Sequence, residues 1–183
     1  IFIADTDRSG RPGIVVVHPT RSVFRRTLER HPALVANEEL DMVIDGQPLT
    51  IDPPEGEPFK PRIPVNPIAL SPDNQTLYFG PMTGEVMYQI DASVLRNPLV
   101  ADDVLFRQVE PYGQKPISDG STADAAGNVY ITDITDHAIG ITRRDGSYVQ
   151  LVRDPELLQW PDAFAYGPDG YVYVAVNQLH KGP

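Results

Sequence analysis

The chain has 183 residues, 41% of them hydrophobic, and its 25 acidic and 15 basic side chains give a formal net charge of −10. That charge argues against binding to nucleic acid or to an anionic membrane surface, both of which need basic patches, although it permits the binding of cations. The absence of cysteine excludes disulfides, thiolate catalysis and cysteine-based zinc sites. No apolar run is long enough for a membrane span. The length of 183 residues is enough for one domain with its own core.

The chain starts within a strand pattern. Segment 2–21 has the pattern of two strands joined by a turn, and it matches the later segment 130–146, with Asp5 in the place of Asp133. A unit that opens at its second strand predicts that the true start of the protein lies upstream.

The next segment, 22–64, interrupts the strand pattern and is rich in proline and acidic residues. We interpret it as the outer strand of the first unit followed by a long loop across one face, a kind of loop that is usually functional or a cover. Few helices are expected. Segment 23–31 could form a turn or two, and so could 91–97, with Asp91 or Ser93 as its N-cap.

Three later segments repeat one pattern: a strand of small and apolar residues, a tight turn, and a strand rich in aromatic residues. The segments are 68–91, 121–146 and 163–183, and their matched tyrosines are Tyr78, Tyr130 and Tyr173. A repeat of about 40–50 residues with up to four strands and Gly/Asp turns is typical of a β-propeller. A β-sandwich with coincidentally similar hairpins is the alternative.

The sequence thus predicts an all-β fold, a single partial β-propeller domain over residues 1–183. Its expected units are approximately 1–64, 65–115, 116–158 and 159–183. Together these hold about three blades' worth of strands, whereas a closed ring needs about four blades or more. Either the chain is part of a longer protein, which we favour, or a second copy completes the ring.

Three oxygen-bearing side chains stand at the same phase of the repeat. Asn66, Asp119 and Asp162 each come one or two residues before an expected inner strand, and inner strands line the central channel of a propeller. Oxygen ligands that converge on one axis suit Ca²⁺ or another divalent cation. Gly120 is expected to let the chain turn tightly into its strand. The alternative is purely structural, because Asp and Asn before a strand often hydrogen-bond their own turn.

Three runs carry a family resemblance: "NPIALSPDNQTLYF", "GQKPISDGSTADAAGNVYITD" and "WPDAFAYGPDGYVYVAVNQL". They resemble the Yellow / major royal jelly protein family, particularly its bacterial members, over nearly the whole chain. The resemblance implies a six-bladed propeller, of which this chain would be roughly the C-terminal half, and it favours secretion or the periplasm. Pro67 and Ala163 depart from the pattern, since glycine would be usual at both positions.

A more distant similarity, to the gluconolactonase / regucalcin / luciferin-regenerating group, implies a divalent metal at the channel mouth. Asn66 and Asp119 match two of its metal ligands, and Asp119 also matches the residue that would act as base in lactone hydrolysis. The Yellow-type pattern implies a pocket for small aromatic amines or sterols, lined by a residue that Asn177 matches. Trp160, the only tryptophan, could stack on such a ligand at the mouth, or could simply be a packing residue.

These observations support a small-molecule-binding propeller whose ligand site at the channel mouth is formed by Asn66, Asp119, Trp160, Asp162 and Asn177. The candidate ligands are aromatic amines and lactones. The alternative is a divalent-metal-dependent lactonase in which Asp119 is catalytic, and a second alternative is a non-catalytic interaction scaffold. No nucleotide or organic cofactor is expected, because the chain has no glycine-rich phosphate loop. A histidine-based zinc site is not expected either, because the four histidines lack metal-ligand spacing.

Overall fold

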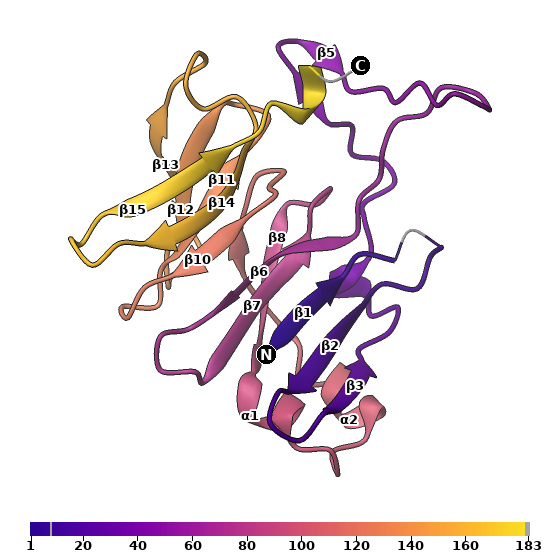
Figure 1. Ribbon diagram of the computed structural model, residues 1–183, viewed down its shortest axis with the longest axis vertical. Coiled ribbons are helices and arrows are strands. Elements are labelled where there is room, and N and C mark those ends of the chain that lie inside the picture. The colour runs from indigo at the N-terminus through magenta and orange to yellow at the C-terminus, as the bar shows by residue number, and fades with distance from the viewer. Residues whose placement is uncertain (8, 182–183) are drawn as a thin grey trace.

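The computed structural model describes residues 1–7 and 9–181 and consists mainly of antiparallel sheets (Figure 1). Consecutive strands form a first blade in the order β1-β2-β3, a second in the order β6-β7-β8-β9, a third in the order β10-β11-β12-β13, and a fourth from β14 and β15. The strands of these blades are β1 (Phe2–Asp5), β2 (Gly13–His18), β3 (Val23–Thr27), β6 (Val65–Leu70), β7 (Thr76–Pro81), β8 (Val86–Asp91), β9 (Glu110–Gln114), β10 (Ser121–Ala123), β11 (Val129–Asp133), β12 (Ala138–Thr142), β13 (Tyr148–Arg153), β14 (Pro161–Tyr166) and β15 (Val172–Val176).

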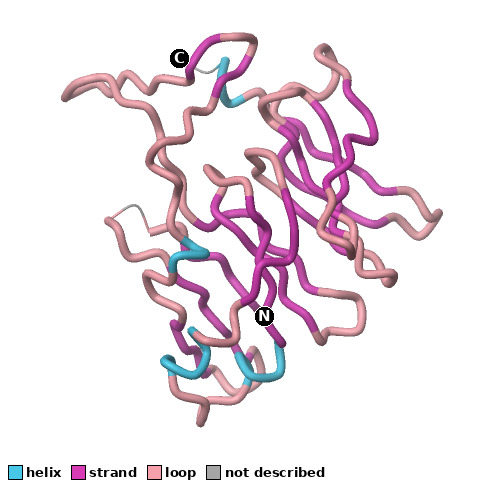
Figure 2. Tube along the Cα trace, turned by 180° about the vertical axis from the view of Figure 1, so that it is seen from behind, coloured by secondary structure: helices cyan, strands magenta, loops and turns pink. Residues whose placement is uncertain are grey.

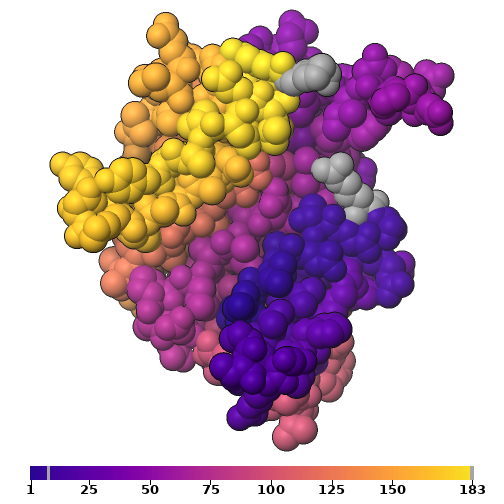
Figure 3. Space-filling model, in the orientation of Figure 1, coloured from indigo at the N-terminus to yellow at the C-terminus, as the bar shows by residue number. Residues whose placement is uncertain are grey.

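The inner strands of neighbouring blades lie against one another. β10 contacts both β6 and β14, and β1 contacts β6. In the last three blades the repeated tyrosine pairs with an inner-strand residue. These pairs are Ala69 with Tyr78, Thr122 with Tyr130, and Ala165 with Tyr173. The predicted repeat therefore corresponds to equivalent hairpins set side by side, and Figure 3 shows residues of the second blade between the first blade and the C-terminal strands.

The helices are short. They are α1 (Ala92–Arg96), α2 (Asp102–Phe106) and the 3-10 turns η1 (Pro32–Leu34) and η2 (Leu179–Lys181). The Asp91 side chain accepts a hydrogen bond from the Ser93 amide at 2.7 Å, so the predicted N-cap of α1 is confirmed. The predicted helical turn over 23–31 is wrong, because residues 23–27 form β3 and pair with β2 along its whole length. No helix in the described part of the chain is long and apolar enough to cross a membrane.

Apolar side chains fill the spaces between blades. Between the first and second blades, Ile14 and Leu28 pack with Leu77, Phe79 and other buried residues, and the buried side chains of α1 and α2 join this cluster. A second cluster between the second and third blades contains Tyr78, Met87 and residues of β10 and β11. Figure 2 shows α1 and α2 at the end of the molecule opposite the loops that cross the other end. The core thus fixes how the inner strands meet.

The segment between β3 and β6 crosses one end of the blades, and we call its residues 37–63 the strap. It contains the hairpin of β4 (Val43–Ile44) and β5 (Gln47–Pro48). Both ends of the strap bond to Thr83, which is fully buried in the turn between β7 and β8. The Asn37 amide donates to the Thr83 carbonyl at 2.8 Å, and the Ile63 amide donates to the Thr83 hydroxyl at 3.0 Å. The strap is therefore anchored at its base to the second blade.

Candidate functional site

Local distortions of two inner strands position two of the predicted site residues. The pairing register of β6 shifts between Val65 and Ile68, and that of β14 shifts between Pro161 and Ala163. Asn66 and Asp162 lie in these irregular stretches. A bulge re-aims the side chain that it contains, and bulges are common beside functional sites. The same distortion also lets β6 accept Pro67, which cannot donate to a regular ladder.

The Asp119 carboxylate is held by donors from the blades on both sides. Its Oδ1 accepts from Nδ2 of Asn66 at 2.6 Å, and its Oδ2 accepts from the indole Nε1 of Trp160 at 2.7 Å. The turn itself is fixed differently, because the amides of Asp119 and Gly120 both donate to the hydroxyl of buried Thr132 at 3.0 Å. The hydrogen bonds of the Asp119 carboxylate thus run between blades and not to its own turn.

Glycine is required at position 120 for a reason other than the tight turn that we expected. Gly120 is not among the glycines with a left-handed backbone, so a tight turn does not require it. A Cβ placed there would instead lie 1.8 Å from the carbonyl oxygen of Asp162. Glycine is needed because the backbone of the neighbouring inner strand comes too close for any side chain. The same close approach brings Asp162 beside Asp119.

Trp160 is packed into the protein. Its side chain is almost fully buried, and its ring lies nearly parallel to that of His180, with the centroids 6.1 Å apart. Its backbone is left-handed, with φ of 57°, which is strained for a bulky residue. The geometry therefore shows a packing and hydrogen-bonding role, and stacking of Trp160 on a ligand stays a prediction.

All five predicted site residues surround one hollow of about 420 Å³. Asn66, Asp119, Trp160, Asp162 and Asn177 line it, together with Thr6, Ile63, Met82 and Leu179. The last four were not predicted: Ile63 lies in the strap, outside the repeat, and Thr6, Met82 and Leu179 lie within repeat or motif segments in which they did not stand out as site residues. The Asn177 side chain also accepts from the Leu179 amide at 3.2 Å, so it shapes the turn beside the hollow. The three residues that share the repeat phase, Asn66, Asp119 and Asp162, thus lie around the same hollow as Trp160 and Asn177.

The hollow has an acidic character. Burial raises the pKa of the Asp119 carboxyl to about 6, the neighbouring Asp162 charge adds to this, and the hydrogen bonds from Trp160 and Asn66 oppose it. In the described part of the chain, no lysine or arginine lines the hollow. A positively charged group entering the hollow would therefore meet two carboxyl groups and, among the described lining residues, no lysine or arginine.

The residues of this chain alone do not suit the binding of a divalent cation. In the described residues, no three or more His, Asp or Glu side chains come together in a way that could hold a metal ion. Both oxygens of Asp119 already accept N–H donors, and Asn66 presents its amide nitrogen to that carboxylate. Ca²⁺ takes six to eight oxygen ligands. These residues do not by themselves form a metal centre, so we derive no step through a metal.

Two residues that shape the site gave little signal in the sequence. Thr132 belongs to the strand motif "VYITD" and could have been suspected from its place in the repeat. Lys115 could not. It is almost fully buried, and its Nζ donates to the Gly84 carbonyl at 2.6 Å, the Pro116 carbonyl at 2.9 Å and the Ser118 hydroxyl at 3.1 Å. It thereby fixes the segment that leads to Asp119, and burial lowers its pKa to about 7.

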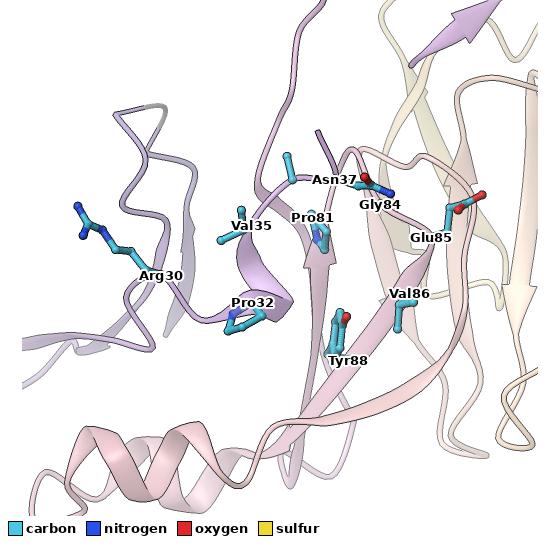
Figure 4. Close-up of a pocket in the computed structure, with 10 residues that line it drawn as sticks. Arg30, Pro32, Val35, Asn37, Pro81, Gly84, Glu85, Val86 and Tyr88 are labelled. Carbon is cyan, nitrogen blue, oxygen red and sulfur yellow. The ribbon is translucent and has the colours of Figure 1, made fainter. Parts of the chain in front are cut away.

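Another hollow, of about 550 Å³, lies between η1 and the strands β7 and β8 (Figure 4). It shares no lining residue with the predicted site. Figure 4 shows the Arg30 side chain turned away from Val86 and Tyr88, and Glu85 on the far side. Its charged groups do not converge on a common point, so we do not assign it a ligand.

Comparison with known proteins identifies the family. Residues 1–182 match the family described as major royal jelly protein. The chain belongs to the major royal jelly protein family. This confirms the resemblance found in the sequence. No curated protein matches the chain.

One solved structure supports the fold of this member of the major royal jelly protein family, and a second is more weakly similar. A gluconolactonase from Xanthomonas campestris is similar with a TM-score of 0.55 at 14% identity, over 92% of this chain and 42% of that protein. A calcium-binding protein, regucalcin, from Agrobacterium tumefaciens has a TM-score of 0.41 at 17% identity, over 92% of this chain and 50% of that protein. The chain thus spans about half the length of these structures. The predicted β-propeller fold is confirmed, whereas so low an identity shows nothing about activity.

Proposed function

We propose that this chain belongs to a small-molecule-binding propeller, and that its ligand is a cationic amine with an apolar, aromatic body. The observation that carries the proposal is the convergence of Asp119, Asp162 and three further side chains around one hollow whose described lining residues include no lysine or arginine. Binding sites commonly combine apolar walls with a few convergent polar groups.

The chemistry of the lining residues supports this ligand class. Asp119 and Asp162 would attract an ammonium group, and the free oxygen of the Asn66 amide could accept a further N–H. Ile63, Met82 and Leu179 provide apolar surface for a hydrocarbon body. The net charge of −10 would favour the approach of a cation at low ionic strength.

A second candidate is hydrolysis of a lactone. It is favoured by the pKa of Asp119, because a carboxyl group that titrates at about 6 is close to the value suited to a general base near neutral pH. Ca²⁺ or another divalent cation would belong to this candidate. It would have to displace N–H donors from Asp119 and find further oxygen ligands outside this set. The amine-binding proposal needs no such rearrangement.

Calorimetric titration distinguishes the candidates. We expect 2-phenylethylamine to bind, and its uncharged isostere 2-phenylethanol to bind at least about tenfold more weakly, because it lacks the charge that the carboxylates attract. Asp119→Asn should abolish this preference, whereas Asp52→Asn on the exposed part of the strap should not. Equal affinity for amine and alcohol would contradict the proposal. Turnover of δ-gluconolactone that depends on Asp119 would favour the hydrolase.

A further inference from the structure

The strap reaches from the second blade to the third. Its base is anchored to Thr83, and Figure 1 shows β5 of its hairpin beside the turn η2. The hairpin turn consists of Asp45 and Gly46, with φ of 53° and 77°. Two consecutive left-handed residues make the tight turn that suits a two-residue hairpin, and Asp-Gly is a favoured sequence for it.

A side-chain contact holds the tip of the hairpin in place. The Asp45 Oδ1 lies 2.8 Å from Nε2 of His137, which is only 2% exposed in the turn between β11 and β12. Asp45 itself is exposed. Its hydrogen bond to His137 is the main reason that the pKa of its carboxyl is lowered, with smaller contributions from His180 and Lys181. The contact is thus between an exposed loop tip and a buried ring.

The underside of the hairpin joins the cluster that contains Trp160. Met42 and Ile44 of the strap form one buried apolar cluster with Met82, Ile117, Ile134 and Trp160. Trp160 therefore has the strap's cluster on its apolar side, while its indole N–H donates to Asp119. The strap's cluster and the candidate ligand site share Trp160, Met82 and Ile63.

We propose that the strap is a hinged cover whose Asp45–His137 latch positions Trp160 against Asp119. Strained backbone persists only where its surroundings hold it, and Trp160 keeps a left-handed conformation. Release of the tip would open the Met42–Ile44 side of the cluster while the bonds to Thr83 held the base. The indole would then lose the packing that directs its N–H to the carboxylate. That the cover controls ligand access rests on the proposed function. That the latch positions Trp160 does not rest on it.

The test uses Trp160 fluorescence in the ligand-free full chain, with Trp160→Phe as the blank. Asp45→Gly removes the latch and keeps a residue suited to the turn, and Asp52→Gly makes the same change elsewhere on the strap. We expect Asp45→Gly to shift the emission to the red and to increase acrylamide quenching. Exchange of the Leu49 amide, which donates to the Met42 carbonyl at 2.7 Å, should quicken roughly fivefold. Asp52→Gly should resemble the wild type.

A second variant guards against an indirect effect. Ile44→Ala leaves the latch intact and removes packing from the cluster, so it should increase quenching in the same direction, while Asp45→Asn, which retains an acceptor oxygen, should stay near the wild type. If the emission and quenching of Asp45→Gly match those of the wild type while Ile44→Ala changes them, the Asp45–His137 contact does not position Trp160 and the proposal is overturned; no change in either variant overturns it as well. Because no ligand is present, this result is independent of whether amines bind.

Discussion

The indole Nε1 of Trp160 lies 2.7 Å from Oδ2 of Asp119, and the hydrogen bond between them crosses from the fourth blade to the third. The other oxygen of Asp119 accepts from Asn66 of the second blade at 2.6 Å. One carboxylate therefore joins three successive blades near the N-terminal ends of their inner strands. Any change at Asp119 should alter both the stability of the blades and the chemistry of the hollow.

Substitution of Asp119 should destabilise the protein in proportion to the donors it leaves unpaired. Asp119→Ala leaves Nδ2 of Asn66 and Nε1 of Trp160 without their acceptor, so we expect the free energy of unfolding in urea to fall by about 2 kcal/mol or more. Asp119→Asn keeps one acceptor oxygen and should lose about half as much. Asp52→Ala, an exposed position on the strap, is the control. Full stability of Asp119→Ala would show that these hydrogen bonds contribute nothing.

Amine binding should weaken in acid. The Asp119 pKa of about 6 means that its charge is present above that pH and lost below it. The affinity for 2-phenylethylamine should therefore fall as pH drops through 6, approaching roughly tenfold per pH unit. Calorimetry between pH 8 and about pH 5 measures this, and Asp119→Asn should show a flat profile. A wild-type profile that is also flat would exclude Asp119 as the counter-charge.

The stability of the ligand-free protein should show the opposite sign. The folded pKa of Asp119 lies above its ordinary value of 3.8, so the folded state holds this proton more tightly than the unfolded chain. Its stabilising contribution is present below about pH 4 and is lost as pH rises through 6. The difference in unfolding free energy between the wild type and Asp119→Asn should change across that window. A constant difference would contradict a raised pKa.

The repeat made most of the fold and the site predictable. Matching hairpins at Tyr78, Tyr130 and Tyr173 indicated equivalent blades, and the same phase brought Asn66 and Asp119 to one end of the inner strands. The period thus carried information that no single motif held.

Features outside the repeat were not predictable. Segment 23–31 contains helix-forming residues, but pairing with β2 overrides that local preference. The need for Gly120 depends on the backbone of Asp162, which is distant in sequence. The role of Lys115 depends on carbonyl groups that the turn after β7 presents to it. These contacts join separate strands and turns of the folded chain, so one sequence does not reveal them.

Gly120→Ala should be among the most damaging alanine substitutions in the chain. Its Cβ would lie 1.8 Å from the backbone carbonyl oxygen of Asp162, so two inner strands would have to separate. We expect a loss of about 3 kcal/mol or more in urea unfolding. Gly13→Ala is the matched control, because the nearest atom to its Cβ would belong to the Arg26 side chain, at 3.2 Å, and not to the backbone of another strand. Equal effects of the two substitutions would contradict the close approach of the strands.

Lys115 should make the stability of the protein rise with pH in the alkaline range. Its folded pKa of about 7 lies below its ordinary value of 10.5, because burial disfavours the charged form. Between these values the unfolded chain binds more protons than the folded one, so the free energy of unfolding should rise by up to about 1.4 kcal/mol per pH unit. Lys115→Met should remove this slope, and it should also lower stability at pH 7 because the Gly84 and Pro116 carbonyls lose their donor. Lys60→Met, on the exposed strap, should keep the slope. Urea unfolding of the three proteins from about pH 7 to about pH 9.5 measures the difference. If the unfolding free energies of the wild type and Lys115→Met change in parallel with pH, then Lys115 keeps an ordinary pKa, and the carbonyl groups around its Nζ stabilise the charged ammonium.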